Sequence, residues 1–518
     1  MKNVSIVIPA IKKRAVIPDQ LVKKLNGKIL IQRAIDTSKE IVSNEQILVV
    51  TDSEEISLIC ERNKIKFYYD KTLNLDSNNI LDVVNNILKT SNDIILFRAN
   101  TPLIKAKTIK DAYHFFKKNK NNIIISSKKV NTKLFKFDNG LIFQNGDFYE
   151  ELKSFYIYNQ KSSKEFIPFE IKEEEAIEIE SYQDWWICEK LLQRKRIVFN
   201  VIGNVKVGMG HIYRALSLAH EITDHEIIFV CSNADKLAVD KIASKDYKVI
   251  ESENVKKTIL ELKPDILIND ILNTNEKFIL TLKKQGIKIV NFEDLGSGAK
   301  YANIVFNELY ETPILEYKNI LWGSDWYFLR DEFDGAEQNN FEENVKNVLI
   351  TFGGTDQHNL TLISLKAIYP FIQEKNINVQ IICGGGYLYK EELNNYLKES
   401  EYKNIEVNYQ TAIISKKMEN IQLAITSNGR TVYELAHMHI PSIVISQHER
   451  ENTHKFSKLE NGFINLGIID KNIYDKIQHY VKKMIYDKEY RYLLYLNSLK
   501  FHFLNNKKRV INKIMELL

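Results

Sequence analysis

Short runs of β-branched and aliphatic residues alternate along the chain with longer stretches of amphipathic spacing. The runs are SIVIPA, QILVVTD and DIILFRA, then IVFNVIG, EIIFVC, DILIND and KIVNFED, and finally VLITFGG, VQIICGG, LAITS and SIVIS. Each run has the length of a strand that is buried on both faces, and a helical stretch separates it from the next. The pattern predicts an α/β fold whose parallel sheets carry helices on both faces.

Two polar stretches indicate where this pattern is interrupted. The first group of runs ends near the segment DWWICEK, after which QRKR leads into a new strand at Ile197. A second polar stretch, residues 334–344, precedes the strand at 348–351. We therefore predict three parts, 1–193, 196–338 and 345–518, of which the last two are doubly wound sheets in series.

Composition and charge exclude several classes of protein. The 72 basic and 67 acidic residues are interleaved, so the net charge of +5 does not indicate a nucleic-acid partner. The four cysteines are far apart and form no CxxC pair, which argues against a zinc site or a disulfide framework. No stretch reaches the roughly 18 apolar residues of a membrane span, and no leader peptide precedes the first strand. We expect a cytoplasmic protein without a membrane span.

The opening strand runs into a basic loop. It ends at Pro9 and Ala10, and Lys12, Lys13 and Arg14 follow. Ligands of doubly wound sheets lie beyond the carboxyl ends of the strands, so this loop is a candidate for binding a nucleotide triphosphate. A solvated basic loop is the alternative interpretation.

The order of motifs over about the first 190 residues resembles the cytidylyltransferase family that makes CMP-sialic acids and related sugars. The matching segments are IPA at 8–10, LNGK at 25–28, VTDSEEI at 50–56, RANTPL at 98–103, and EIE with DW at 178–185. The resemblance implies binding of CTP and a nonulosonic acid, with CTP contacts from Pro9, Ala10, Lys12, Arg14, Lys28 and Asp52. It also implies a Mg²⁺ ion on Glu178 and Glu180, because hard oxygen ligands suit this ion.

The nucleotide loop departs from the family pattern. The family reads roughly A-R-G-G-S-K, whereas residues 10–15 here read AIKKRA, so the glycines that let the backbone wrap a phosphate are absent. Two interpretations stay open: an active cytidylyltransferase in which basic side chains bind the phosphates, and a degenerate domain kept for structure or binding. Glu178 and Glu180 could equally be solvent-facing positions of an edge strand.

A glycine-rich turn follows the strand at 197–202. The segment GNVKVGMGHIYRALSLA lets a ligand approach the backbone at a helix start, where an anion is favoured. Its pattern G-x-G-H-x-x-R-x-L-x-L-A resembles the hydrolase family that removes UDP from a 2,4-diacetamido-2,4,6-trideoxy sugar in pseudaminic acid biosynthesis, and that family's spore-coat polysaccharide relatives. FED at 292–294 and FGGTD at 352–356 extend the match. The resemblance implies a two-lobed GT-B architecture with a UDP-sugar in the cleft.

The same resemblance implies the residues of a UDP-sugar site. His211 would activate water or orient the leaving group, since the pKa range of histidine suits proton transfer near neutrality. Glu434, in the segment TSNGRTVYE, would hold the ribose. The implied UDP contacts are Gly208, Gly210, Gly353, Gly354, Thr355, Ser427, Asn428, Gly429 and Glu434. The alternatives are that His211, Ser427 and Asn428 only cap helices. The family's R-x-D ahead of the glycine turn is replaced here by residues 200–202, NVI, so the sugar contacts must differ.

Together the two resemblances predict a bifunctional enzyme of nonulosonic acid biosynthesis, with UDP-sugar hydrolysis in the C-terminal part and a cytidylyltransferase-like N-terminal part. One alternative is a GT-B glycosyltransferase for a surface polysaccharide, because the fold alone does not separate water from another acceptor. Another alternative is a non-catalytic nucleotide-sugar-binding assembly protein. A homodimer is left open.

Overall fold

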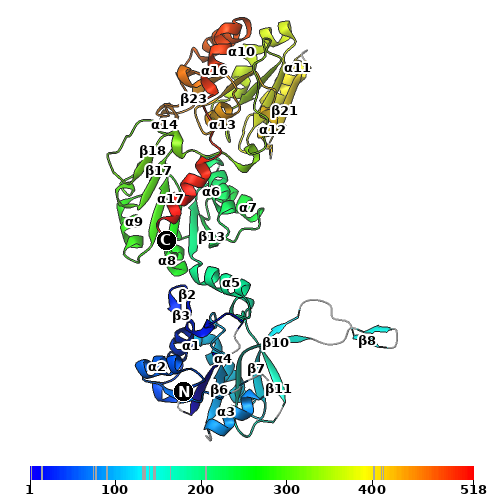
Figure 1. Ribbon diagram of the computed structural model, residues 1–518. Helices are drawn as coiled ribbons and strands as arrows, with labels where there is room; N and C mark the ends of the chain where they lie inside the picture. The colour runs from blue at the N-terminus through cyan, green and yellow to red at the C-terminus, as the bar shows by residue number, and fades with distance from the viewer. Residues whose placement is uncertain are drawn as a thin grey trace. The chain divides into compact units, whose positions relative to one another are not determined.

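The computed structural model describes residues 1, 3–12, 16–73, 75, 79–88, 92–130, 136–138, 141–143, 148–163, 165–204, 207–400, 403–409, 411 and 413–518. They form two compact units, Met1–Arg194 and Lys195–Leu518. The predicted α/β class is confirmed in both units (Figure 1). All four cysteines are buried and unpaired. Within the described ranges, no helix is both long and apolar enough to cross a bilayer.

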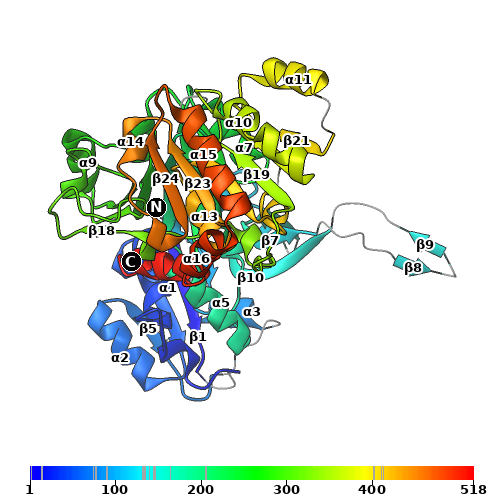
Figure 2. The same ribbon diagram turned by 90° about the horizontal axis from the view of Figure 1, so that it is seen from above.

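The first unit is built on a mixed seven-stranded sheet of order β11-β7-β10-β6-β1-β4-β5. Only β10 runs antiparallel to its neighbours β6 and β7, a reversal that the hydrophobic runs could not reveal. The strands are β1 (Val4–Ala10), β4 (Ile47–Thr51), β5 (Lys66–Tyr69), β6 (Asp93–Phe97), β7 (Ile123–Lys129), β10 (Tyr149–Tyr158) and β11 (Phe166–Glu170). Two small hairpins are β2 (Lys24–Leu25) with β3 (Lys28–Ile29), and β8 (Lys136–Asp138) with β9 (Leu141–Phe143), the second visible in Figure 2.

Helices cover both faces of this sheet. On β1, Ile6 and Ile8 belong to one apolar core and Val7 belongs to the other, which explains why the strand reads as an uninterrupted hydrophobic run. The LNGK segment forms the β2–β3 turn, in which Asn26 and Gly27 both have positive φ, as a two-residue hairpin requires. The helices are α1 (Leu30–Lys39), α2 (Glu54–Asn63), α3 (Ile80–Leu88), α4 (Ala106–Lys118) and α5 (Tyr182–Gln193).

The second unit begins with a lobe built on an entirely parallel sheet of order β14-β13-β12-β15-β16-β17-β18. Helices α6, α7 and α17 contribute to the core on one face, and α8 and α9 to the core on the other. The strands are β12 (Arg196–Val201), β13 (Glu226–Ser232), β14 (Val249–Ser252), β15 (Ile266–Asp270), β16 (Lys288–Phe292), β17 (Ile304–Asn307) and β18 (Ile320–Trp322). The helices are α6 (Gly210–Glu221), α7 (Lys236–Ala243), α8 (Val255–Leu262), α9 (Glu276–Lys283) and α17 (Asn506–Met515).

The second lobe repeats this plan with the parallel order β21-β20-β19-β22-β23-β24. Helices α10 and α15 pack side by side on one face of the sheet (Figure 2). The strands are β19 (Asn347–Thr351), β20 (Asn378–Cys383), β21 (Ile405–Tyr409), β22 (Leu423–Ser427), β23 (Ser442–Ser446) and β24 (Phe463–Ile468). The helices are α10 (Leu360–Lys375), α11 (Lys390–Glu399), α12 (Ser415–Met418), α13 (Thr431–His437), α14 (Glu449–Asn452), α15 (Ile473–Tyr486) and α16 (Lys488–Ser498).

The two lobes share an apolar core, and the end of the chain crosses from the second lobe back to the first. Tyr327 of the segment joining the lobes stacks on Tyr433 of α13, with ring centroids 4.1 Å apart, and Phe503 packs against both rings. The chain then returns to the first lobe as α17 (Figure 1). Val510 and Ile514 of this helix belong to the core of that lobe. The sequence range 345–518 therefore includes a last helix that packs on the other lobe.

Strand order identifies one edge of each lobe as a crevice. In both sheets the first strand lies between the second and the fourth, so the chain turns to opposite sides after β12 and β15, and again after β19 and β22. Ligands of open α/β sheets bind at such switch points, beyond the carboxyl ends of the strands. The residues that follow these four strands are therefore the first candidates for a ligand site.

Candidate functional site

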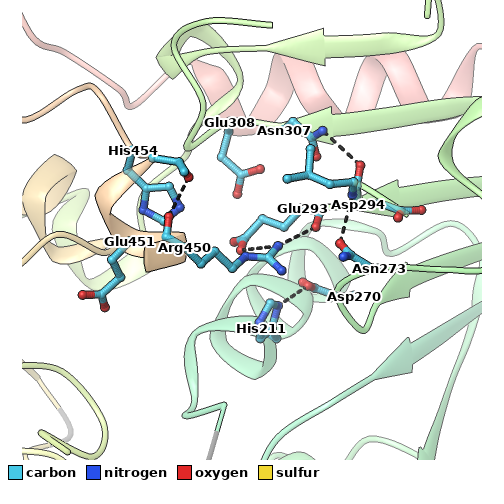
Figure 3. Close-up of polar contacts among 12 residues, drawn as sticks. His211, Asp270, Asn273, Glu293, Asp294, Asn307, Glu308, Arg450, Glu451 and His454 are labelled. Atoms are coloured by element: carbon cyan, nitrogen blue, oxygen red, sulfur yellow. Dashed lines mark hydrogen bonds and ion pairs between the residues drawn. The ribbon is translucent and has the colours of Figure 1, made fainter. Parts of the chain in front are cut away.

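His211 and Asp270 meet at the switch point of the first lobe. His211 is the second residue of α6, which follows β12, and Asp270 ends β15. The His211 Nδ1 atom lies 2.6 Å from Asp270 Oδ1, and both side chains are buried (Figure 3). The N-cap of α6 is Met209, without a side-chain cap bond. The alternative that His211 caps the helix is therefore wrong.

The partners of His211 determine where its proton lies. An ionised carboxylate only accepts hydrogen bonds, so the short contact to Asp270 requires a hydrogen on Nδ1. Arg214 Nη2 also lies 3.0 Å from Nδ1, but a guanidinium cannot accept, and this nitrogen donates to Asp270 as well. We assign the proton to Nδ1, which leaves Nε2 as the acceptor that a general base needs.

Arg214 is the centre of a buried charge cluster. Its side chain is 0% exposed and donates to three carboxylates of the first lobe, those of Asp270, Glu293 and Glu308. Burial alone would raise the pKa of Asp270, but Arg214 and His211 outweigh it and lower this pKa. The pKa of Glu293 is lowered in the same way, chiefly by Arg214 against its burial. Asp270 and Glu293 are thus held ionised, and ionised Asp270 continues to accept the hydrogen bond from His211.

Two arginines of the second lobe, Arg430 and Arg450, contact this cluster of the first lobe. Arg430 Nη1 donates to Glu308 at 2.7 Å, while the guanidinium stacks on Tyr327. Arg450 Nη2 donates to the main-chain oxygen of Glu293 at 2.8 Å (Figure 3). Both contacts join residues from opposite lobes beside the His211–Asp270 pair. Together with Arg214, these two arginines bring three cations to the three carboxylates of the cluster.

The backbone is strained where this cluster meets the strand ends. Glu293, directly after β16, has φ 51°, and Leu272, two residues after β15, has φ 66°. Side chains with a β-carbon rarely adopt this left-handed region, and such residues gather at functional sites. For Glu293 the conformation is maintained by Arg214 and by a bond from its own N–H to the Phe306 carbonyl at 2.9 Å.

Three asparagines form a row of hydrogen bonds across neighbouring strands of the first lobe. Asn200 of β12 donates to Asn269 of β15, and Asn269 donates to Asn291 of β16, both at 2.9 Å. Asn291 in turn donates to Asp294 at 2.6 Å. All four side chains are buried. Asn200, which replaces part of the R-x-D segment of the resembling family, is thus used inside the sheet and is not exposed to a sugar.

The glycines predicted to bind UDP gather from both lobes. A β-carbon added at Gly354 would lie 3.4 Å from the Cα atom of Gly208, and one added at Gly210 would lie 3.3 Å from Arg430. Gly353 and Gly429 both face the Ser427 hydroxyl, each with a β-carbon position 3.9 Å from it. The glycine turns of the first and second lobes therefore lie close to each other. Thr355 lies beside Gly386, on the loop that continues from Gly354.

Two other predicted UDP contacts are engaged within the protein. The Asn428 side chain donates to Ser446 and to two carbonyls and accepts from Ser457, which leaves only its main chain for a ligand. Glu434 Oε1 accepts from Arg330 Nη2 at 2.9 Å. The N-cap of α13 is Arg430, without a side-chain cap bond, so the alternative that Ser427 and Asn428 cap this helix is wrong.

Glu451 is a carboxyl at the same edge that the sequence did not suggest, and 14% of its side chain is exposed. Its Oε2 accepts from the Gln447 N–H at 2.8 Å, and Oε1 lies 3.9 Å from the β-carbon position of Gly429. Burial raises the pKa of Glu451 to about 7, whereas that of an unfolded glutamate is 4.5. The folded protein therefore binds this proton more tightly than the unfolded chain does.

This shift predicts a stability change with pH. The stabilising proton on Glu451 is fully present below pH 4.5 and is lost as pH rises through about 7. A Glu451→Gln variant keeps a neutral side chain, so it should gain stability relative to the parent, up to about 3 kcal/mol, between pH 5 and pH 8. Thermal unfolding of both proteins across this range checks it. Equal pH profiles would contradict a protonated Glu451.

The predicted CTP residues are divided in the first unit. Ala10 accepts from Thr51 at 2.7 Å, and the Lys12 N–H donates to Asp52 at 2.7 Å, so the ends of β1 and β4 are tied together. Pro9 belongs to β1, and Lys12 Nζ pairs with two carboxylates, Asp19 and Glu55. Lys28, in contrast, pairs with Asp36 on α1. Arg14 lies outside the described residues.

The predicted metal ligands do not fit a divalent cation as they stand. Glu178 Oε1 accepts from Arg98 at 2.6 Å and from Asn100 at 2.9 Å. Glu180 is exposed, and its N–H donates to Asp184. In the described part of the chain, no group of three acidic, histidine or cysteine side chains could hold a metal ion. A Mg²⁺ ion on Glu178 would share this carboxylate with the Arg98 guanidinium, which already occupies Oε1.

The chain joins a unit built on a mixed sheet to a unit of two lobes with parallel sheets, an arrangement typical of nucleotide-binding α/β proteins. Residues 13–228 match the cytidylyltransferase family, and residues 348–513 match the glycosyltransferase family 28 C-terminal domain. The chain is therefore similar to the cytidylyltransferase family over one part and to the family 28 C-terminal domain over another, in agreement with the resemblance seen in the sequence.

Three individual proteins are similar to parts of this chain. The chain is 32% identical over 267 residues to the uncharacterized protein MJ1062 of Methanocaldococcus jannaschii, a match covering 48% of this chain and 54% of that protein. It is 26% identical to the spore coat polysaccharide biosynthesis protein SpsG of Bacillus subtilis, over 51% of this chain and 82% of SpsG. A Helicobacter pylori protein named pseudaminic acid cytidylyltransferase and UDP-2,4-diacetamido-2,4,6-trideoxy-beta-L-altropyranose hydrolase is 28% identical over 35% of this chain and 34% of its own. The chain thus spans about half the length of the first of these relatives.

Proposed function

We propose that the second unit hydrolyses a UDP-sugar in the cleft between its lobes. The observation that carries this proposal is the His211–Asp270 pair at the β12/β15 switch point, facing glycine turns from both lobes. A β-carbon added at Gly208 would meet no atom within 4 Å, and such open backbone suits the close approach of a diphosphate. The histidine supplies a base beside it, as the reaction of the anomeric carbon with water requires.

The mechanism assigns a role to each charged group. Asp270 fixes the imidazole with its hydrogen on Nδ1, so Nε2 accepts the proton of the attacking water. The water oxygen bonds to the anomeric carbon as the bond to the UDP oxygen breaks. Arg430 and Arg450 neutralise the charge that develops on the departing phosphate. Arg214 keeps Asp270 ionised and does not touch the substrate.

For the first unit we propose nucleotide binding at the joined ends of β1 and β4, with CTP as the nucleotide and a nonulosonic acid as the related sugar. Pyrophosphate release that depends on Mg²⁺ at Glu178 and Glu180 is not expected while Arg98 holds Glu178. This favours the interpretation of a unit kept for binding. The two units would then serve the biosynthesis of a nonulosonic acid for a surface glycan.

Phosphorus NMR of the full chain with a panel of UDP-sugars tests the hydrolase proposal. Release of UDP without any acceptor supports it. UDP release that requires an added acceptor would establish a glycosyltransferase in its place. Tight UDP binding with no turnover of any sugar would favour the non-catalytic assembly protein.

Two variants separate the proposed role of Glu434 as the ribose ligand from its ion pair with Arg330. We expect Glu434→Gln to weaken UDP binding about tenfold or more, because a hydrogen bond to a charged group is worth about 1.5 to 3 kcal/mol. Arg330→Met is the matched control, since it removes the partner of the carboxylate and leaves the carboxylate. Calorimetry of UDP binding checks both. Equal losses in the two variants would make Glu434 a structural residue.

A further inference from the structure

An ion pair lies in the first unit where the cytidylyltransferase resemblance implies a metal. Arg98 directly follows β6, so it stands at the carboxyl end of the sheet, where nucleotides bind. Its Nη1 donates to Glu178 Oε1 at 2.6 Å, and Asn100 Nδ2 donates to the same oxygen. The Arg98 and Glu178 side chains are 19% and 13% exposed. Solvent therefore screens this pair less than it screens a surface pair.

The backbone on both sides of the pair is fixed. The Arg98 N–H donates to the Ser154 carbonyl at 3.0 Å, and the Ile179 N–H donates to the Asn100 carbonyl at 2.9 Å. The buried Gln20 side chain donates to the Ile179 carbonyl at 2.8 Å. These bonds fix the main chain beside both partners, so the two side chains start from positions that keep them within reach of each other.

We propose that Arg98 takes the place of the divalent cation at Glu178, so that the first unit binds nucleotides without Mg²⁺. A guanidinium stays charged at every relevant pH, and a second cation on the same carboxylate would be repelled by it. Mg²⁺ also gives up its water reluctantly, so an occupied carboxylate is a poor site for it. The proposal rests on the nucleotide-binding role assigned to this unit.

The resemblance itself supplies the sharpest variant. The segment RANTPL stands where the family reads Q-P-T-S-P-L, so Arg98→Gln restores a neutral side chain that occurs in the family and releases Glu178. A second variant combines Arg98→Gln with Glu178→Gln, which removes the released carboxylate. Lys128→Gln is the matched control, because it removes the same charge from an exposed pair with Glu173 in the same unit.

Calorimetry of CTP binding to the full chain, with Mg²⁺ and with EDTA, tests the proposal. We expect the parent and Lys128→Gln to bind CTP equally well in both solutions. Arg98→Gln should bind CTP at least about tenfold more tightly with Mg²⁺ than with EDTA. The double variant should bind CTP equally well in both solutions. Thermal unfolding verifies that each variant is folded.

Three results would overturn the proposal: CTP binding by the parent that requires Mg²⁺, a folded Arg98→Gln variant that gains no Mg²⁺ dependence, or no CTP binding in either solution. UDP release by the second unit is measured on the same samples. A loss of UDP release alone concerns the hydrolase proposal, because Arg98 lies in the other unit.

Discussion

Replacing His211 with Ala is expected to slow UDP-sugar hydrolysis about 10²- to 10⁴-fold, the usual range for loss of a general base, with little change in UDP affinity. Asp270→Asn should also lower turnover, because an amide no longer fixes the imidazole with its hydrogen on Nδ1. Single-turnover UDP release and calorimetry of UDP binding measure the two quantities separately.

His220→Ala is the control for this series. His220 lies on the same helix, is largely exposed and pairs with Asp331 away from Asp270, so its loss should leave turnover unchanged. A His211→Ala variant that keeps full turnover on the true UDP-sugar would contradict the site. An equal loss in His220→Ala would indicate damage to α6 rather than loss of a base.

Replacing Arg214 with Met is expected to have the largest effect on stability. The substitution leaves Asp270, Glu293 and Glu308 buried without their common cation. Removing one partner of a buried ion pair typically costs about 3 to 5 kcal/mol. Three carboxylates share this cation, and Glu308 keeps a close second cation in Arg430. Denaturant-induced unfolding, followed through the transition of the second unit, measures the loss in free energy of unfolding. A cost below about 1 kcal/mol would contradict the central role of Arg214.

In the Arg214→Met variant, the dependence of folding stability on pH should change sign. In the parent, the lowered pKa values of Asp270 and Glu293 add stability above pH 4 to 5 that is lost as pH falls. Without Arg214 these buried carboxyls favour their neutral forms, so stability should fall as pH rises. Arg491→Met is the matched control. Arg491 is equally buried but donates only to main-chain carbonyls, so its loss should give no such reversal.

The strands of all three sheets follow the hydrophobic runs of the sequence closely. The run IVFNVIG became β12, and LAITS became β22. Such runs are readable because strands buried on both faces need an apolar residue at nearly every position. The direction of β10 was not readable, since antiparallel and parallel strands bury the same side chains. The packing of α17 on the first lobe was missed for a similar reason: an amphipathic pattern shows that a helix has a buried face, not which sheet covers it.

The candidate site was predictable only where a local pattern carried it. Glycine turns and the histidine that follows one of them are visible in sequence, because the turn needs residues that tolerate close approach. Asp270 and Glu451 have no such pattern around them. Asp270 ends an ordinary strand, 59 residues from His211. Only the order of the strands shows that β12 and β15 are neighbours.

The sequence by itself determined the α/β class, the glycine turns and His211, because each of these depends on spacing between residues near one another in the chain. The tertiary structure decided the charges that act on that histidine. Arg214 is one turn from His211 on α6, yet the carboxylates that surround it come from the ends of three strands. The structure likewise paired Glu178 with Arg98 across 80 residues. A charge's partner depends on distance through space, and in a parallel sheet that distance is set by strand order, which hydrophobic runs do not encode.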